Sequence, residues 1–96
     1  MTDSTELHNL LTPEALSDAS TLRVTRTVVE EGEDSTGDPA LFVWVLLSDD
    51  TAESDQTWDR LQPIAQRVKA LLREHGESRW PYIRFQTESF FARRAG

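Results

Sequence analysis

The stretch ALFVWVLL, residues 40–47, decides how this chain of 96 residues folds. Its side chains alternate between two faces of an extended strand, with Leu41, Val43, Val45 and Leu47 on one face and Phe42, Trp44 and Leu46 on the other. A strand that is apolar on both sides is usually central in its sheet and covered on both faces. We therefore predict a central strand over about residues 40–48.

Two further strands flank this one in the sequence. TLRVTRTVVE, residues 21–30, alternates, with Leu22, Val24 and Val28 facing the core and Arg23, Thr25 and Thr27 facing away. The polar connection EGEDSTGD, residues 31–38, indicates a hairpin loop between these two strands. The last strand is expected over about residues 81–88, with Ile83 and Phe85 in the core.

Two helices complete the pattern. Thr12 suits an N-cap and Pro13 the first helical position, which predicts a short helix over about residues 13–19. A longer helix is expected over residues 55–75, with Asp55 as N-cap and a kink or break near 60–63 caused by Pro63. Its apolar stripe, at helical spacing, comprises Trp58, Leu61, Ile64, Ala65, Val68, Leu71, Leu72 and His75.

The order helix–strand–strand–helix–strand predicts a small α+β two-layer sandwich, in which the long kinked helix covers one face of a three-stranded sheet. We expect a polar N-terminal leader over residues 1–11, a single α+β domain over 12–90 and a tail over 91–96. The layout resembles that of the type II KH domain and of the bacterial ribosome-binding factors built on it. The Gly-x-x-Gly loop of that family is absent from this chain.

Composition limits the function classes. The net charge of −7 argues against a protein that coats nucleic acid, although residues 1–59 carry −12 and residues 60–96 carry +5. Such asymmetry points to a partner, unless the two halves interleave in space. Cysteine is absent, the longest apolar run is too short to span a membrane, and residues 1–9 do not resemble a signal peptide. We therefore expect a cytoplasmic protein.

Residues suited to catalysis are scarce. The only histidines are His8, in the predicted leader, and His75, at a helix end, and the chain has no phosphate loop, nucleophile elbow or zinc motif. The largest carboxylate cluster comprises Asp49, Asp50, Glu53, Asp55 and Asp59. Its spacing does not match a calcium loop, and helix capping and loop solubility account for it. We predict no enzymatic activity, no cofactor and no metal site.

The aromatic side chains suggest a binding surface. On the sheet face away from the long helix we expect an apolar centre with a polar and Arg rim, and its candidate partner-binding residues are Arg23, Phe42, Trp44, Leu46, Tyr82 and Arg84. Trp, Tyr and Arg are enriched in protein interfaces, and aromatic residues beside Arg also stack nucleic-acid bases. The alternative is that the N-terminal helix folds over this face and buries it.

A second candidate surface is basic. Its residues, on the polar side of the long helix and just after it, are Arg60, Arg67, Lys69, Arg73 and Arg79. They represent either a solvated helix face or an RNA-binding patch. The sequence thus predicts a small acidic protein-interaction module, a subunit or regulator like an inhibitor, antitoxin or immunity protein, bound to a larger protein or to itself. The alternative is an RNA- or ribosome-associated factor of KH-like layout.

Overall fold

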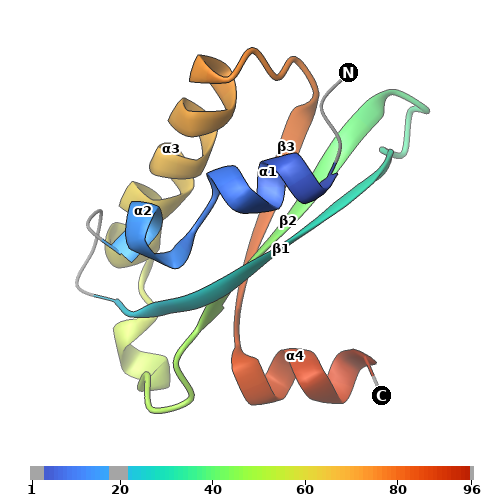
Figure 1. The fold of residues 1–96 in the computed structure, drawn as a ribbon. Coiled ribbons are helices and arrows are strands. Elements are labelled where there is room, and N and C mark those ends of the chain that lie inside the picture. Colours follow the sequence, from blue (N-terminus) through green and yellow to red (C-terminus); the bar gives the residue numbers. More distant parts are fainter. Residues whose placement is uncertain (1–3, 18–21, 96) are drawn as a thin grey trace.

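A computed structural model describes residues 4–17 and 22–95 and shows a three-stranded mixed sheet with helices on both faces (Figure 1). The elements, in chain order, are α1 (Ser4–Leu10), α2 (Pro13–Ser17), β1 (Val24–Glu33), β2 (Pro39–Leu47), the 3-10 helix η1 (Glu53–Asp55), α3 (Trp58–Glu74), β3 (Trp80–Thr87) and α4 (Glu88–Ala95). The predicted α+β fold and its element order are confirmed.

The apolar strand β2 is central, as predicted. It pairs antiparallel with β1 through a hairpin and parallel with β3 through the α3 crossover. Asp34 organises the hairpin turn, because its carboxylate accepts hydrogen bonds from the backbone N–H groups of Thr36 and Asp38 at 2.9 and 3.1 Å. Gly37 adopts φ of 87° there, a left-handed conformation that favours glycine.

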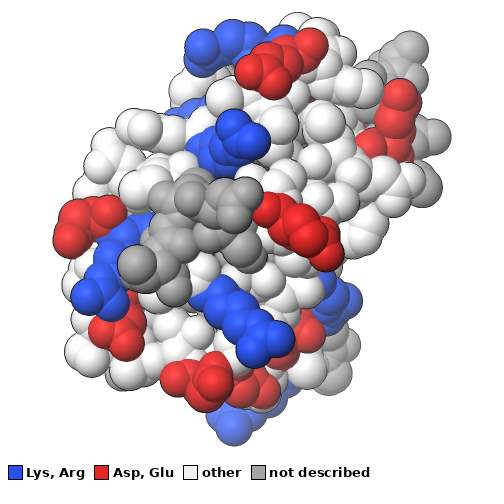
Figure 2. Space-filling view, turned by 60° about the vertical axis from the view of Figure 1, so that its left-hand side comes forward, with Lys and Arg blue, Asp and Glu red and all other residues white. Residues whose placement is uncertain are grey.

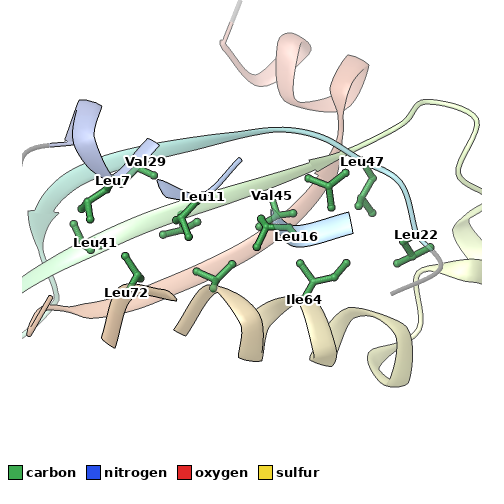
Figure 3. Close-up of a cluster of buried hydrophobic side chains, with 13 residues drawn as sticks. Leu7, Leu11, Leu16, Leu22, Val29, Leu41, Val45, Leu47, Ile64 and Leu72 are labelled. Carbon is green, nitrogen blue, oxygen red and sulfur yellow. The ribbon is translucent and has the colours of Figure 1, made fainter. Parts of the chain in front are cut away.

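The hydrophobic core lies between the sheet and a layer formed by α1, α2 and α3 (Figure 3). Leu7, Leu11 and Leu16 from the N-terminal segment, and Ile64 and Leu72 from α3, point toward the strands. On β2, the predicted face of Leu41, Val43, Val45 and Leu47 is fully inside this core. Thr27 is the one described polar residue that is buried, and its hydroxyl donates a 2.7 Å hydrogen bond to the Leu11 carbonyl.

The N-terminal segment contains a helix that the sequence did not predict. Residues 4–10, expected to be part of a frayed polar leader, form α1. Leu7 and Leu11, four residues apart, lie on one side of this turn and are fully buried. The short second helix begins as predicted: the Ala15 N–H donates to the Thr12 hydroxyl at 3.2 Å, and Pro13 is the first helical residue. The remainder of the predicted helix, residues 18–19, lies outside the described residues.

The long helix starts later than predicted and is not broken at Pro63. Asp55 ends the separate turn η1, and α3 runs without a break through Pro63. The carbonyl that loses its partner at Pro63 belongs to Asp59, which is exposed in the first turn and accessible to water. Trp58 is 63% exposed rather than part of the stripe, because the side chain of a first helical residue points beyond the helix end.

The end of α3 follows the sequence prediction. Gly76, with φ of 88°, is the residue after the cap His75. The N–H groups of Gly76 and Glu77 donate to the carbonyls of Arg73 and Leu72 at 3.0 and 2.9 Å, which is a Schellman motif. Among the described helices, none is long and apolar enough to cross a membrane.

A β-bulge changes which residues of β1 face the core. The pairing with β2 shifts between Val24 and Arg26, so that Thr25 is the extra residue. After the bulge the alternation is reversed relative to the prediction. Val29 and Thr27 therefore face the core, whereas the expected core residue Val28 faces the other side of the sheet and is half-buried.

Candidate functional site

The sheet face opposite α3 is divided into a covered half and an open half. The helix α4 covers the half at the C-terminal end of β2, where the rings of Phe91 and Trp44 are 5.7 Å apart. An ion pair of 2.9 Å joins Glu88 to Arg26 of β1. The Asp49 carboxylate accepts a 2.8 Å hydrogen bond from the Ser89 N–H and so caps the start of α4.

The open half, near the hairpin, holds a cluster of aromatic side chains. The rings of Phe42 and Tyr82 stack with their centroids 5.7 Å apart. Phe42 lies against Gly32, where an added Cβ would be 2.9 Å from the ring atom Cε2. The Arg84 guanidinium sits 5.8 Å from the centre of the Trp44 ring. We call Phe42, Tyr82 and Arg84, resting on Trp44, the open-face cluster.

The hairpin turn contributes a charge to the edge of the open-face cluster. The Tyr82 hydroxyl donates a long hydrogen bond of 3.4 Å to the Asp34 carboxylate. Desolvation, followed by the negative charge of Asp34, raises the pKa of Tyr82. The pKa of Asp34 itself is lowered, chiefly by the hydrogen bond from the Thr36 hydroxyl. At neutral pH the cluster thus contains a neutral phenol between a carboxylate and a guanidinium.

The structure brings together four of the six predicted partner-binding residues. Phe42 is half-buried, Tyr82 is 37% exposed, Arg84 is exposed, and Trp44 lies beneath them at 7% exposure. Leu46, by contrast, is fully buried on the half that α4 covers and offers no surface to a partner.

Arg23 is also separated from the cluster. Its carbonyl accepts a hydrogen bond from Ser48, beyond the opposite end of β2 from Phe42. Its positive charge helps to lower the pKa of Asp50, after the larger effect of the hydrogen bond from the Ser48 hydroxyl.

The alternative that an N-terminal helix covers the aromatic face is not what the structure shows. The two helices α1 and α2 contact β1 and α3 on the core side of the sheet. The cover on the aromatic face comes from the other end of the chain, through Phe91 of α4. It leaves the Phe42 end open.

Most of the candidate nucleic-acid-binding residues are engaged within the domain. Arg60 pairs with Asp55 at 2.9 Å, and Arg67 donates to the Ala15 carbonyl at 3.2 Å. Arg79 is only 13% exposed and bridges Glu77 and Glu31 at 2.8 and 2.7 Å. The Lys69 ammonium lies 5.4 Å from the centre of the Trp80 ring, and Arg73 is exposed.

The charges of the two halves of the sequence interleave in space. The ion pairs Arg26–Glu88 and Arg79–Glu31 each join an early residue to a late one. On the face presented in Figure 2, Lys and Arg side chains are interspersed with Asp and Glu. The division of charge along the chain therefore does not become a division into two surfaces on this face.

The carboxylates near the end of β2 have separate structural partners. Asp49 caps α4, Asp50 accepts a hydrogen bond from the Ser48 hydroxyl, and Asp55 pairs with Arg60. Within the described part of the chain, no group of three or more His, Cys, Asp or Glu side chains is arranged to hold a metal ion.

Sequence reasoning missed Phe91 and Trp80 as surface determinants. Phe91 lies in a segment interpreted as a tail, although its amphipathic pattern after a strand was the available signal. Trp80, the residue before the predicted last strand, is 58% exposed and lies under the Lys69 ammonium. Comparison of the chain with protein-family models, curated proteins and solved structures finds no match.

Proposed function

We propose that this chain is a non-enzymatic protein-interaction module, a small acidic subunit or regulator that binds a larger protein through the open-face cluster. The observation that carries the proposal is the half-covered sheet face: α4 seals one half, and the Phe42–Tyr82 pair and Arg84 occupy the other. Inhibitors, antitoxins and immunity proteins are regulators of this kind.

The chemistry of the cluster suits a protein partner. Aromatic and Arg side chains carry much of the binding energy in protein interfaces, because they bury a large area with few rotatable bonds. The Phe42 and Tyr82 rings are already stacked on each other, so little side-chain freedom remains to be lost on binding. The surrounding carboxylates, including Asp34, favour a partner surface with basic groups.

The RNA-binding alternative has weaker support. Three of its five candidate residues, Arg60, Arg67 and Arg79, already hydrogen-bond to protein oxygens. Phosphate binding at those positions would have to displace these contacts. Lys69 and Arg73 are the two candidates for which the described residues provide neither an ion pair nor a hydrogen bond to a protein oxygen.

The test is affinity capture from lysate of the native host with tagged wild-type protein and the tagged variant Tyr82→Ala/Arg84→Glu. Both preparations are split and treated with or without ribonuclease, and retained proteins are quantified by mass spectrometry. We expect one or two stoichiometric proteins that persist after nuclease treatment and are lost with the variant, since Tyr82 and Arg84 are both accessible.

The matched control is Arg60→Glu, which makes the same charge change as Arg84→Glu at an exposed position on α3 outside the open-face cluster. Retention of the captured proteins by this control and loss by the open-face variant would assign the binding to the cluster. Capture of ribosomal proteins or RNA that disappears with nuclease, and with Arg60→Glu, would instead support the RNA-associated alternative.

A further inference from the structure

The two outer strands of the sheet differ in how their free edges are protected. β1 contains a bulge at Thr25 and several charged side chains, namely Arg26, Glu30, Glu31 and Glu33. Bulges and charges are the usual devices that prevent an edge strand from pairing with another chain. β3, WPYIRFQT, pairs with β2 in continuous register and carries Arg84 as its one charged residue. Among the described residues, no strand lies beyond β3.

The core is also incomplete at the β3 edge. Ile83 and Phe85 pack against the core but stay half-buried, whereas the neighbouring β2 residues Val43 and Val45 are buried. The helices α1 and α2 contact β1 at the opposite side of the sheet. A strand added beside β3 would therefore remove more apolar surface of Ile83 and Phe85 from water.

Pockets lie at both ends of the same edge. One pocket, at the N-terminal end of β3, is lined by Trp80 and Pro81, by the cations Lys69, Arg73 and Arg79, and by one carboxylate, that of Glu77. Arg79 already pairs with Glu77 at 2.8 Å, so the charges of Lys69 and Arg73 remain in excess. The other, at the C-terminal end, is lined by Phe85, Gln86 and Thr87 together with Phe90 and residues of the β2–α3 connection. The first combines an aromatic wall with positive charges, and the second has the apolar rings of Phe85 and Phe90.

From this edge and its two pockets we propose that β3 binds an extended segment of a partner protein as a fourth strand. Backbone hydrogen bonds to the edge would hold the segment, and side chains in the two pockets would give specificity. The first pocket takes a carboxylate, because Lys69 and Arg73 have no carboxylate partner among the described residues. The second takes an apolar side chain against Phe85 and Phe90.

The geometry also sets the spacing of these two residues in the partner segment. Alternate side chains of a strand share a face, so the acidic and apolar residues are separated by an even number of positions. Pro81 and Phe85, which line the two pockets, are four residues apart in β3. The expected motif has Asp or Glu four or six positions from a large apolar residue.

Pro81 indicates which backbone groups are available. Proline is tolerated within a sheet where its nitrogen faces away from the neighbouring strand. Because backbone groups alternate in direction along a strand, the N–H groups of Ile83 and Phe85 share the outward direction with Pro81. These two amides are the donors that the partner strand would engage.

The inference rests on the proposed function in taking a protein as the partner, but it assigns a second surface. The test selects from a phage-displayed library of random twelve-residue peptides on the immobilised full chain, and then adds the enriched synthetic peptide to isotope-labelled protein. We expect enrichment of the acidic–apolar motif and at least roughly tenfold slower amide hydrogen exchange at Ile83 and Phe85 in the complex.

A charge-swap pair provides the control. Lys69→Glu/Arg73→Glu should weaken binding of the acidic peptide at least roughly tenfold. It should recover binding of a peptide in which the acid is replaced by Lys, a result that a merely destabilised variant would not give. Absence of enrichment, or an enriched peptide that leaves the exchange of Ile83 and Phe85 unchanged, would overturn the inference.

The outcome is separable from that of the proposed function. Tyr82→Ala/Arg84→Glu alters the sheet face and leaves both pockets intact. If the open-face variant loses the captured protein while no peptide protects the β3 edge, the proposed function stands and this inference fails. If peptides dock at the edge but the open-face variant captures proteins normally, the edge is the binding surface and the open-face proposal fails.

Discussion

Replacement of Trp44 by Ala tests whether the C-terminal helix α4 packs on the half of the aromatic face that contains Trp44. Trp44 is 7% exposed, with the Phe91 ring 5.7 Å away and the Arg84 guanidinium 5.8 Å from its ring centre. A buried aromatic side chain removes about 150–250 Å² from water. Loss of roughly 150 Å² at about 25 cal/mol per Å² corresponds to ~4 kcal/mol, within the ~3–5 kcal/mol typical of Trp→Ala in a core.

The assay for Trp44→Ala is urea denaturation followed by far-UV circular dichroism. A domain of this size has a stability of roughly 5–15 kcal/mol, so a loss of ~4 kcal/mol moves the midpoint far toward zero denaturant. The matched control is Trp58→Ala, because Trp58 is 63% exposed and the same substitution there should cost less than about 1 kcal/mol. Similar small losses for both variants would refute the packing of α4 against Trp44.

Three further perturbations address single contacts. Glu77→Gln should cost about 1–3 kcal/mol at pH 7, because the hydrogen bond from Arg79 lowers the pKa of Glu77 to about 2. This contribution to stability is complete above pH 4.5, the ordinary pKa of a Glu side chain, and is lost as the pH falls toward 2. The unfolding free energies of the two proteins, measured by urea titration, should therefore converge at low pH. A difference that does not depend on pH would contradict the role of the Glu77 carboxylate. Gly32→Ala should displace the Phe42 ring while changing the free energy of unfolding by less than about 1 kcal/mol. The displacement should shift the NMR resonances of the ring protons, and unshifted resonances would contradict the close approach of Gly32 to the ring. Asp49→Ala should cost about 1 kcal/mol and speed hydrogen exchange in α4, whereas unchanged exchange would show that this cap is dispensable.

The central strand and its two neighbours were predictable because their apolar patterns are strong. The two-sided apolar pattern of β2 can be satisfied only inside a sheet, and the structure places it there. Gly76 was equally predictable as the residue that ends α3, since the left-handed conformation favours glycine.

The errors arose where tertiary contacts override the local pattern. The bulge at Thr25 reverses the faces of β1, and a period of two cannot reveal an inserted residue. The helix α1 has only seven residues and depends on the burial of Leu7 against the sheet, so its polar sequence gives a weak signal. Asp49 was interpreted as part of an acidic cluster, although its partner, the Ser89 N–H, is forty positions away in the sequence.

These differences also explain which part of the candidate site was predicted. Phe42, Tyr82 and Arg84 share a face because they follow the regular alternation of β2 and β3, which pair in continuous register. The loss of Leu46 from the exposed surface required knowledge of where α4 packs. That position depends on contacts between segments distant in the sequence, such as the Arg26–Glu88 ion pair.

The most direct test of the central claim is the affinity of the captured partner for the purified wild-type chain and for Tyr82→Ala/Arg84→Glu, measured by isothermal titration calorimetry. Both residues are accessible, so the variant should retain the wild-type circular dichroism spectrum. Loss of two interface residues at about 1.4 kcal/mol or more each predicts an affinity at least roughly 100-fold lower. An affinity within about threefold of wild type, with folding intact, would contradict binding through the open-face cluster.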